Sequence, residues 1–337
     1  AAEELLGVLE HDELVLDDRG VGAEDVRGVD LPVLQRTIGG LPGLERLIQG
    51  RPQNDFTRAL KDSVALIGQC ALHYAQQARA LGKPETAQAL ESIAARPPAT
   101  LREAIQLTWL YNCLSGIMDY GRMDVYLGDF LARDLKSGLL TRESALEMLV
   151  GLWRLMVARK TVYHGRVVIG GLGRPNEKNA DEFALLAMEA SRVVRDIEPQ
   201  LTLRLYKGQD ERLYRKGLEL IGTGATYPLL YNDEVNVPAV QNALGVSRMD
   251  AEQYVPFGCG EYIIDHKSFG SPNGVINMLK ALEVTLFNGR ELIKGQQMGL
   301  AEGGLTAFDT FEELYAAYKR QIALSIEVLA EVEKLIL

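Results

Sequence analysis

A cysteine set between two glycines and followed by a glutamate is the feature of this sequence that most suggests chemistry. Residues 258–261 read Gly-Cys-Gly-Glu and follow a strand-like segment at 254–257. Because glycine lets the backbone turn sharply, Cys259 is expected to project from a tight loop. Glu261 lies close enough to exchange a proton with whatever the sulfur attacks, and partial desolvation would raise its pKa for that work. Taken alone, the same residues also fit a small buried thiol beside a solvated carboxylate.

A conventional thiol enzyme needs a base, which is usually histidine. His164 and His266 are the candidates nearest to Cys259 along the sequence. Ordinary surface or turn positions suit both histidines equally well. A thiol-histidine enzyme therefore stays open as one alternative.

The elements that would position this loop alternate between strands and helices. Four segments have strand patterns, at residues 166–170, 200–206, 227–231 and 254–257. Within 200–206, leucines at 201, 203 and 205 alternate with Thr202, Arg204 and Tyr206. Strands that alternate with helices predict a largely parallel sheet covered by helices. The polar side of 200–206 would then face a polar, ligand-lined interior, although an edge strand with one wet face fits as well.

Helical patterns dominate the rest of the chain. Apolar residues recur at helical spacing over 55–96, with a break at Gly82-Lys83-Pro84 that predicts two helices. Capping boxes at 100–103 and 310–313 begin two further helices, and others begin near residues 141, 179, 211 and 247. The first 50 residues show no sustained period and are expected to form short elements and loops.

Composition excludes several classes of protein. The 337 residues carry 36 Lys and Arg against 46 Asp and Glu, for a net charge of -10. Such a chain is not expected to bind nucleic acid or a membrane surface. Its three cysteines are far apart, which argues against a disulfide framework or a metal knuckle and favours a reducing, cytoplasmic setting.

Ten sequence blocks resemble, in the same order, those of the glycyl radical enzymes, the family that includes pyruvate formate-lyase, glycerol and diol dehydratases, choline lyase and arylacetate decarboxylases. They include Tyr-Gly-Arg-Met-Asp at 120–124 and Tyr-Asn-Asp-Glu-Val at 231–235. The others lie at residues 96–109, 169–171, 179–182, 200–205, 222–228, 245–247, 254–261 and 282–289. Each block is modestly specific, but together they span most of residues 20–335.

The resemblance implies an α/β fold that is predominantly helical and contains a β/α barrel. That barrel would have about ten strands from two half-barrels and would be incomplete at its C-terminal end. Residues 1–98 would form a mostly helical region packed on the barrel, and residues 99–337 the barrel portion. The cysteine loop would lie near 254–262.

The resemblance also implies roles for the loop residues. The family's loop cysteine becomes a thiyl radical that abstracts hydrogen from substrate, a role that falls on Cys259, and the glutamate of its Gly-Cys-Val-Glu motif matches Glu261. The implied enzyme is a lyase, dehydratase or decarboxylase acting on a small polar metabolite. This chain departs from the family at Gly260, where a bulkier apolar residue is usual, and at Tyr262, where proline is usual. No second cysteine adjoins Cys259, which disfavours pyruvate formate-lyase activity itself.

Four residues are the predicted substrate-binding set: Asp119, Tyr206, Asn273 and His164. A surface or structural role fits each of them at least as well. Residues 115–119 lack the histidine that diol dehydratases supply there, and Asn273 falls near an expected aspartate. Both departures put a glycerol-like substrate in doubt.

Two polar segments are expected to be structural, and no metal site is predicted. Arg122 and Asp124 are expected to form an ion pair that helps to close the barrel. Residues 232–234, Asn-Asp-Glu, are expected to form an ordinary turn.

The family stores its radical on a glycine in a C-terminal motif resembling Arg-Val-x-Gly-Tyr, and no such motif follows Cys259. We expect this chain to bind no cofactor itself. The glycyl radical would come from a segment not present here, on a continuation of the chain or on a second chain. An S-adenosylmethionine iron-sulfur activase would generate it. The absent initiator methionine and the helical end at residue 337 favour a fragment or a processed chain.

The remaining implied partners are a small-molecule substrate and a second copy of the chain in a homodimer. A different class of function is also open. The chain could be a non-catalytic remnant of the scaffold that binds a metabolite or a full-length relative, in which case Cys259→Ser would change nothing measurable.

Overall fold

The chain forms two compact units. The computed structural model describes residues 40–115, 119–160, 165–258, 260–265, 267 and 275–336. Unit 1 spans Ala1–Gly270 and unit 2 spans Ser271–Leu337. Among the described helices, none is long and apolar enough to cross a lipid bilayer.

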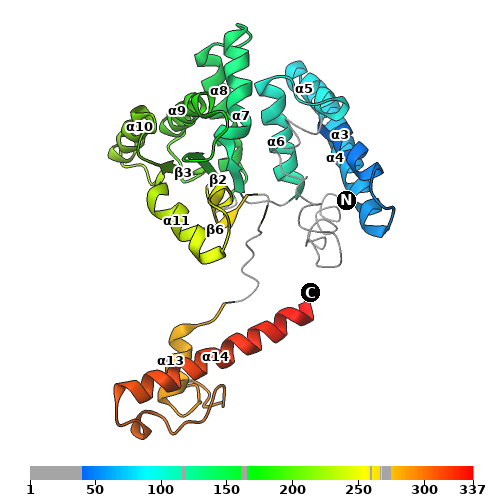
Figure 1. Cartoon of the computed structure of the whole chain (residues 1–337). Helices are drawn as coiled ribbons and strands as arrows, with labels where there is room; N and C mark the ends of the chain where they lie inside the picture. The colour runs from blue at the N-terminus through cyan, green and yellow to red at the C-terminus, as the bar shows by residue number, and fades with distance from the viewer. Residues whose placement is uncertain are drawn as a thin grey trace. The chain divides into compact units, whose positions relative to one another are not determined.

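Four parallel strands form the central sheet of unit 1, in the order β1-β2-β3-β4. They are β1 (Asp119–Arg122), β2 (Arg166–Gly170), β3 (Gln200–Leu205) and β4 (Leu229–Asn232). The helices between them are α7 (Met123–Lys136), α8 (Arg142–Ala158), α9 (Glu177–Val194) and α10 (Glu211–Gly222), and they cluster around β2 and β3 in Figure 1. This alternation confirms the predicted parallel sheet covered by helices.

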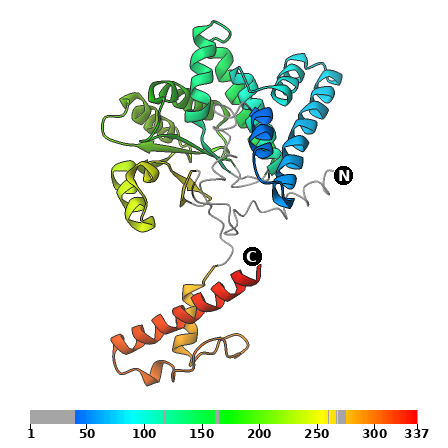
Figure 2. The same ribbon diagram turned by 45° about the vertical axis from the view of Figure 1, so that its right-hand side comes forward.

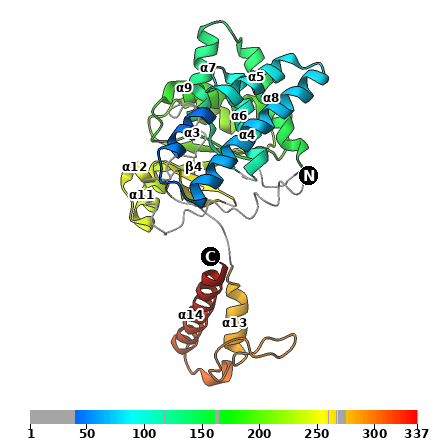
Figure 3. The same ribbon diagram turned by 90° about the vertical axis from the view of Figure 1, so that its right-hand side faces the viewer.

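Four helices precede the sheet: α3 (Gly40–Gln49), α4 (Asp55–Ala80), α5 (Pro84–Ala95) and α6 (Leu101–Ser115). The predicted break at 82–84 separates α4 from α5, and the two helices pack through Ala71, Ala75, Leu90 and Ile93. Helix α3 lies against α4 (Figure 3). The domain boundary expected at residue 98 remains a prediction. Helices α5 and α6, which lie on its two sides in the sequence, pack together within unit 1.

Two short helices and a hairpin follow β4. They are α11 (Asp233–Leu244), α12 (Arg248–Ala251), β5 (Tyr254–Phe257) and β6 (Glu261–Ile264). Strands β5 and β6 are antiparallel, and Phe257 pairs with Glu261 next to the turn. Apolar side chains of α11 and α12 pack on Tyr254 and Ile264, which anchors the base of the hairpin.

Unit 2 is built on two helices that lie side by side, α13 (Met278–Leu286) and α14 (Phe311–Ile336) (Figure 2). A single 3-10 turn, Leu305–Ala307, lies between them in the sequence. The capping box predicted for α14 is present. The Glu313 amide donates to Thr310 Oγ1 (3.2 Å), and the Thr310 amide donates to Glu313 Oε2 (3.3 Å).

The two faces of the sheet differ in chemistry. Val167, Ile169, Leu201 and Leu203 are fully buried in the core that the sheet shares with its helices. Side chains at the alternate positions, Arg166, Thr202 and Arg204, are buried on the opposite face and hydrogen-bond there to polar groups. The alternation predicted in 200–206 is therefore confirmed for β3, whose polar face carries the buried hydrogen-bonding side chains.

Several boundaries differ from the sequence predictions. Strand β4, Leu229–Asn232, begins and ends later than the predicted 227–231. Strands β1 and β6 and helices α7 and α11 were not predicted. Residues 232–234 are not an isolated turn, because Asn232 caps α11 by accepting a hydrogen bond from the Glu234 amide (3.0 Å).

Candidate active site

The hairpin β5–β6 lies across the polar face of the sheet, held by arginines from three neighbouring strands. Arg204 of β3 donates to the carbonyl oxygens of Tyr254 (2.8 Å) and Glu252 (3.0 Å). Arg122 of β1 donates to the carbonyl oxygen of Glu252 (3.2 Å). Each guanidinium is buried, so these bonds to backbone oxygens fix the start of β5 against the carboxyl ends of the strands.

The tip of the hairpin reaches the other end of the same strands. The Gly258 amide donates to Asp119 Oδ2 (3.0 Å), at the start of β1. Arg166, at the start of β2, donates to the Gly258 carbonyl through Nη2 (2.7 Å) and Nε (3.1 Å). Gly258 and Gly260 have φ of +51° and +115°, which side-chain-bearing residues rarely adopt, so the glycine pair is required for this turn.

Arg166 is itself oriented by β3. Its Nη1 donates to Thr202 Oγ1 (3.0 Å), and its Nη2 donates to Gln200 Oε1 (3.2 Å). All three side chains are buried. The parallel register that pairs Arg166 with Gln200 brings these groups together.

Asp119 is a carboxyl in a crowded acidic environment. Burial raises the pKa of Asp119 to about 6, and the negative charges of Glu198 and Glu261 add to that rise. The Gly258 amide and the charge of Arg166 oppose it. Asp119 therefore titrates nearer to neutrality than an exposed aspartate.

Glu261 begins β6 directly beside the turn. Its Oε2 lies 2.9 Å from the position that a Cβ on Gly258 would take, so the carboxylate leans over the first glycine. The side chain is exposed. The described residues thus place Glu261 at the hairpin tip but do not give it the partial desolvation expected from the sequence.

The two departures from the family pattern lie in one aromatic cluster. A Cβ on Gly260 would lie 3.0 Å from the hydroxyl of Tyr231, so the missing side chain leaves room for that hydroxyl. Tyr262 packs edge-on against Tyr231 and at a tilt against Tyr254, with ring centroids 6.1 and 5.3 Å apart. Gly260 and Tyr262 therefore belong to one packing arrangement that fills this side of the hairpin with tyrosines.

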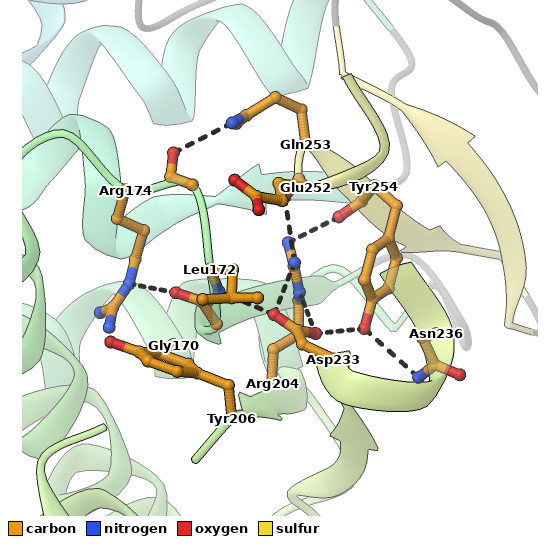
Figure 4. Close-up of polar contacts among 12 residues, drawn as sticks. Gly170, Leu172, Arg174, Arg204, Tyr206, Asp233, Asn236, Glu252, Gln253 and Tyr254 are labelled. Carbon is orange, nitrogen blue, oxygen red and sulfur yellow. Dashed lines mark hydrogen bonds and ion pairs between the residues drawn. The ribbon is translucent and has the colours of Figure 1, made fainter. Parts of the chain in front are cut away.

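A buried ion pair secures the base of the hairpin (Figure 4). Arg204 donates to both oxygens of Asp233, at 3.0 and 2.8 Å, and neither side chain is exposed to solvent. The Tyr254 hydroxyl donates to Asp233 Oδ1 (2.6 Å), and the Leu172 amide donates to Asp233 Oδ2 (2.7 Å). The Tyr254 ring also lies over the guanidinium at 3.9 Å. Burial raises the pKa of Tyr254, so this hydroxyl remains a donor.

The predicted Arg122–Asp124 ion pair is wrong. Asp124 pairs with Arg174 (3.2 Å) and also accepts from the Gly170 amide (2.7 Å). Arg122 donates to carbonyl oxygens, including those of Gly170 and Leu172. Consecutive strand and helix positions send these two side chains in different directions, which the sequence spacing alone did not reveal.

Gly171 offers a test of how closely the chain packs on the buried pair. At φ +84° its added Cβ would lie 2.7 Å from both Arg204 Nε and Asp233 Oδ2, whereas Gly138, at φ +73°, would meet nothing within 4 Å. In both Gly171→Ala and Gly138→Ala, the new alanine must adopt the left-handed backbone conformation. Each substitution should therefore lower the free energy of unfolding by about 1–2 kcal/mol. Gly171→Ala should lower the free energy of unfolding by a further ~1–3 kcal/mol, because its added methyl group overpacks the buried pair. Denaturant unfolding measures both losses. Equal losses in the two variants would contradict this packing.

The structure brings some of the predicted site residues together and separates others. Asp119 and Glu261 both lie beside Gly258 at the hairpin tip. Tyr206 follows the last residue of β3, at the Arg204–Asp233 end of the sheet (Figure 4), and its amide donates to Gln209 Oε1 (3.2 Å). Cys259, His164, Asn273 and the alternative base His266 lie outside the described residues, so their roles remain predictions.

Arg166 is the residue of this site that the sequence argument missed. The sequence pattern predicts it only as the first residue of a strand. A signal was available, because a charged side chain in the apolar run Arg166–Gly170 is costly to bury unless it has partners. Among the described residues, no group of three or more His, Cys, Asp or Glu side chains is placed to bind a metal ion.

The fold and hairpin define an α/β protein in which a glycine-flanked turn is held on the polar face of a parallel sheet. A family model described as pyruvate formate lyase-like matches residues 45–337. The chain therefore belongs to the pyruvate formate lyase-like family, as its sequence blocks indicated.

Individual relatives agree with this assignment. The chain is 25% identical to trans-4-hydroxy-L-proline dehydratase of Clostridioides difficile, in a match covering 80% of this chain and 38% of that protein. It is 31% identical to isethionate sulfite-lyase of Oleidesulfovibrio alaskensis, over 67% of this chain and 30% of that protein. A glycyl radical enzyme from Archaeoglobus fulgidus has the same fold, with a TM-score of 0.74 at 23% identity, over 91% of this chain and 43% of the other. The chain thus spans well under half the length of these relatives.

Proposed function

We propose that this chain carries the hydrogen-abstracting part of a glycyl radical lyase, dehydratase or decarboxylase acting on a small polar metabolite. The observation that carries the proposal is the hairpin tip, where the Gly258 peptide is held by Asp119 and Arg166 with the Glu261 carboxylate beside it. Two relatives are named for trans-4-hydroxy-L-proline and isethionate, and both compounds carry a hydroxyl group. These names favour a hydroxylated substrate.

The proposed reaction uses Cys259 and Glu261. A thiyl radical on Cys259 takes a hydrogen atom from a substrate carbon, which forms the S–H bond and leaves a substrate radical. As the adjacent bond from carbon to a heteroatom or to a carboxylate breaks, Glu261 gives or takes the proton that the leaving group requires. The product radical then takes the hydrogen atom back from the thiol, so the cysteine is regenerated.

The radical itself would come from outside this chain. We propose that a glycyl-bearing segment, in a continuation or a second chain, passes the radical to Cys259. A radical S-adenosylmethionine activase would generate it, and this chain would hold no cofactor of its own. We further propose a homodimer in a reducing cytoplasm, as the family resemblance and the three separated cysteines favour.

Anaerobic activation tests the proposal. The chain, completed with a glycyl-bearing segment and treated with an activase, should show a glycyl radical signal in electron paramagnetic resonance. It should then convert at least one member of a panel of small hydroxylated metabolites that includes trans-4-hydroxy-L-proline and isethionate. A full radical signal with binding but no conversion across the panel would instead favour a non-catalytic metabolite-binding scaffold.

A further inference from the structure

We propose that Asp119 and Arg166 are positioning residues. They fix the Gly258 peptide and so set the direction of the backbone that leads to Cys259. In this role Asp119 is not a substrate ligand. The inference rests on the proposed function only for the role of Cys259. Its structural basis lies wholly in described residues of β1, β2, β3 and the hairpin.

Both polar groups of Gly258 are held by side chains from different strands. Its N–H donates to Asp119 of β1 (3.0 Å), and its carbonyl oxygen accepts two hydrogen bonds from Arg166 of β2 (2.7 and 3.1 Å). Glycine has the widest choice of backbone conformation, and Gly258 has φ +51°, so the local sequence imposes little order on this turn. Contacts from the sheet must therefore supply that order.

Arg166 is suited to this task because its guanidinium cannot turn freely. Thr202 and Gln200 of β3 accept its remaining hydrogen bonds from a buried position. The planar group is therefore aimed at Gly258 by contacts that do not involve the hairpin. A preorganised donor loses little conformational freedom when it binds a backbone carbonyl.

Keeping Asp119 ionised in this buried position costs free energy, which indicates that its contact with the Gly258 amide has a function. One oxygen accepts from Gly258, while Oδ1 is buried without a hydrogen-bond partner among the described residues. The charged groups that face it are Arg166 of β2, Glu198 just before β3, and Glu261 of β6. At pH 7.5, above the Asp119 pKa of about 6, the carboxylate is ionised and makes a charge-assisted bond to the hairpin.

Amide hydrogen exchange of the 337-residue chain at pH 7.5 tests this role without any need for turnover. Asp119→Ala should exchange roughly tenfold faster over residues 254–264, the loss expected for one charge-assisted hydrogen bond, while peptides of β3 stay protected. Asp119→Asn keeps an acceptor without its charge and should give an intermediate rate, which also covers the case in which the alanine variant does not fold. Asp210→Ala is the matched control, because Asp210 caps α10 away from the hairpin and should leave residues 254–264 unchanged.

Exchange at the wild-type rate across 254–264 in any Asp119 variant that folds would overturn the proposal. Steady-state kinetics of the activated enzyme separate positioning from substrate binding. A positioning residue should lower kcat of the alanine variant with little change in KM, and the asparagine variant should recover part of the loss. A raised KM with unchanged kcat and unchanged exchange would show that Asp119 is a substrate ligand and contradict the inference. Failure of the proposed function would leave the exchange result intact.

Discussion

The Cys259→Ser variant is expected to fold like the parent chain and to form no product. Serine has nearly the same size, but its O–H bond is much stronger than the S–H bond of cysteine, so a glycyl radical cannot generate the oxygen radical that would replace the thiyl radical. Product formation by the anaerobically activated enzyme measures the effect. The glycyl radical signal should persist in the variant, because the proposed store of the radical is the glycyl-bearing segment and not Cys259.

Cys113→Ser is the matched control for this substitution. Cys113 lies on α6 and is partly buried, and burial raises the pKa of its thiol, so it is poorly suited to act as a thiolate. Its replacement should leave turnover close to that of the parent. Turnover that survives Cys259→Ser would remove the sulfur from the reaction and favour another catalytic mechanism.

Replacement of Asp233 by alanine is expected to give the largest loss of stability among the variants considered. The change leaves the Arg204 guanidinium buried without its bidentate partner and removes the acceptor for Tyr254 and Leu172. Breaking a fully buried ion pair from one side typically costs about 3–5 kcal/mol. Denaturant unfolding of unit 1, followed through helix content, measures that loss.

An exposed ion pair of the same type provides the comparison. Glu211 and Arg215 pair on the surface of α10, with side chains 72% and 69% exposed. Glu211→Ala should therefore lose no more than about 0.5 kcal/mol. A loss for Asp233→Ala within 1 kcal/mol of this control would show that the pair at the hairpin base contributes little to stability.

The regular elements of the fold were largely predictable because their patterns are local. The two-residue alternation from Leu201 to Leu205 separates a core face from a polar face, and the capping box at 310–313 marks the start of α14. Strand β1 was missed because it has only four residues, Asp119–Arg122, and three of them are charged or glycine. Strand β6 has no pattern of its own, since its pairing with β5 depends on the turn at Gly258 and Gly260.

The contacts that hold the candidate site together were harder to predict than its residue types. The Gly-Cys-Gly-Glu motif predicted Glu261 next to the turn, where the structure places it, and its catalytic role remains a prediction. The partners of Arg166 and Asp119 lie 92 and 139 positions away at Gly258, so the hydrogen bonds that hold the hairpin depend on strand order. The same reason explains the wrong pairing of Arg122 with Asp124, because the actual partner of Asp124, Arg174, lies 50 residues downstream.

The central claim is that Cys259 takes a hydrogen atom from the substrate, and deuterium labelling of that position tests it most directly. The activated enzyme is given a substrate deuterated at the carbon from which hydrogen is taken, and turnover of labelled and unlabelled substrate is compared for the parent and for Cys259→Ser. If Cys259 abstracts this hydrogen, the parent should show a primary isotope effect on kcat/KM and the variant should form no product. Turnover by the variant, at the same rate for both substrates, would contradict it.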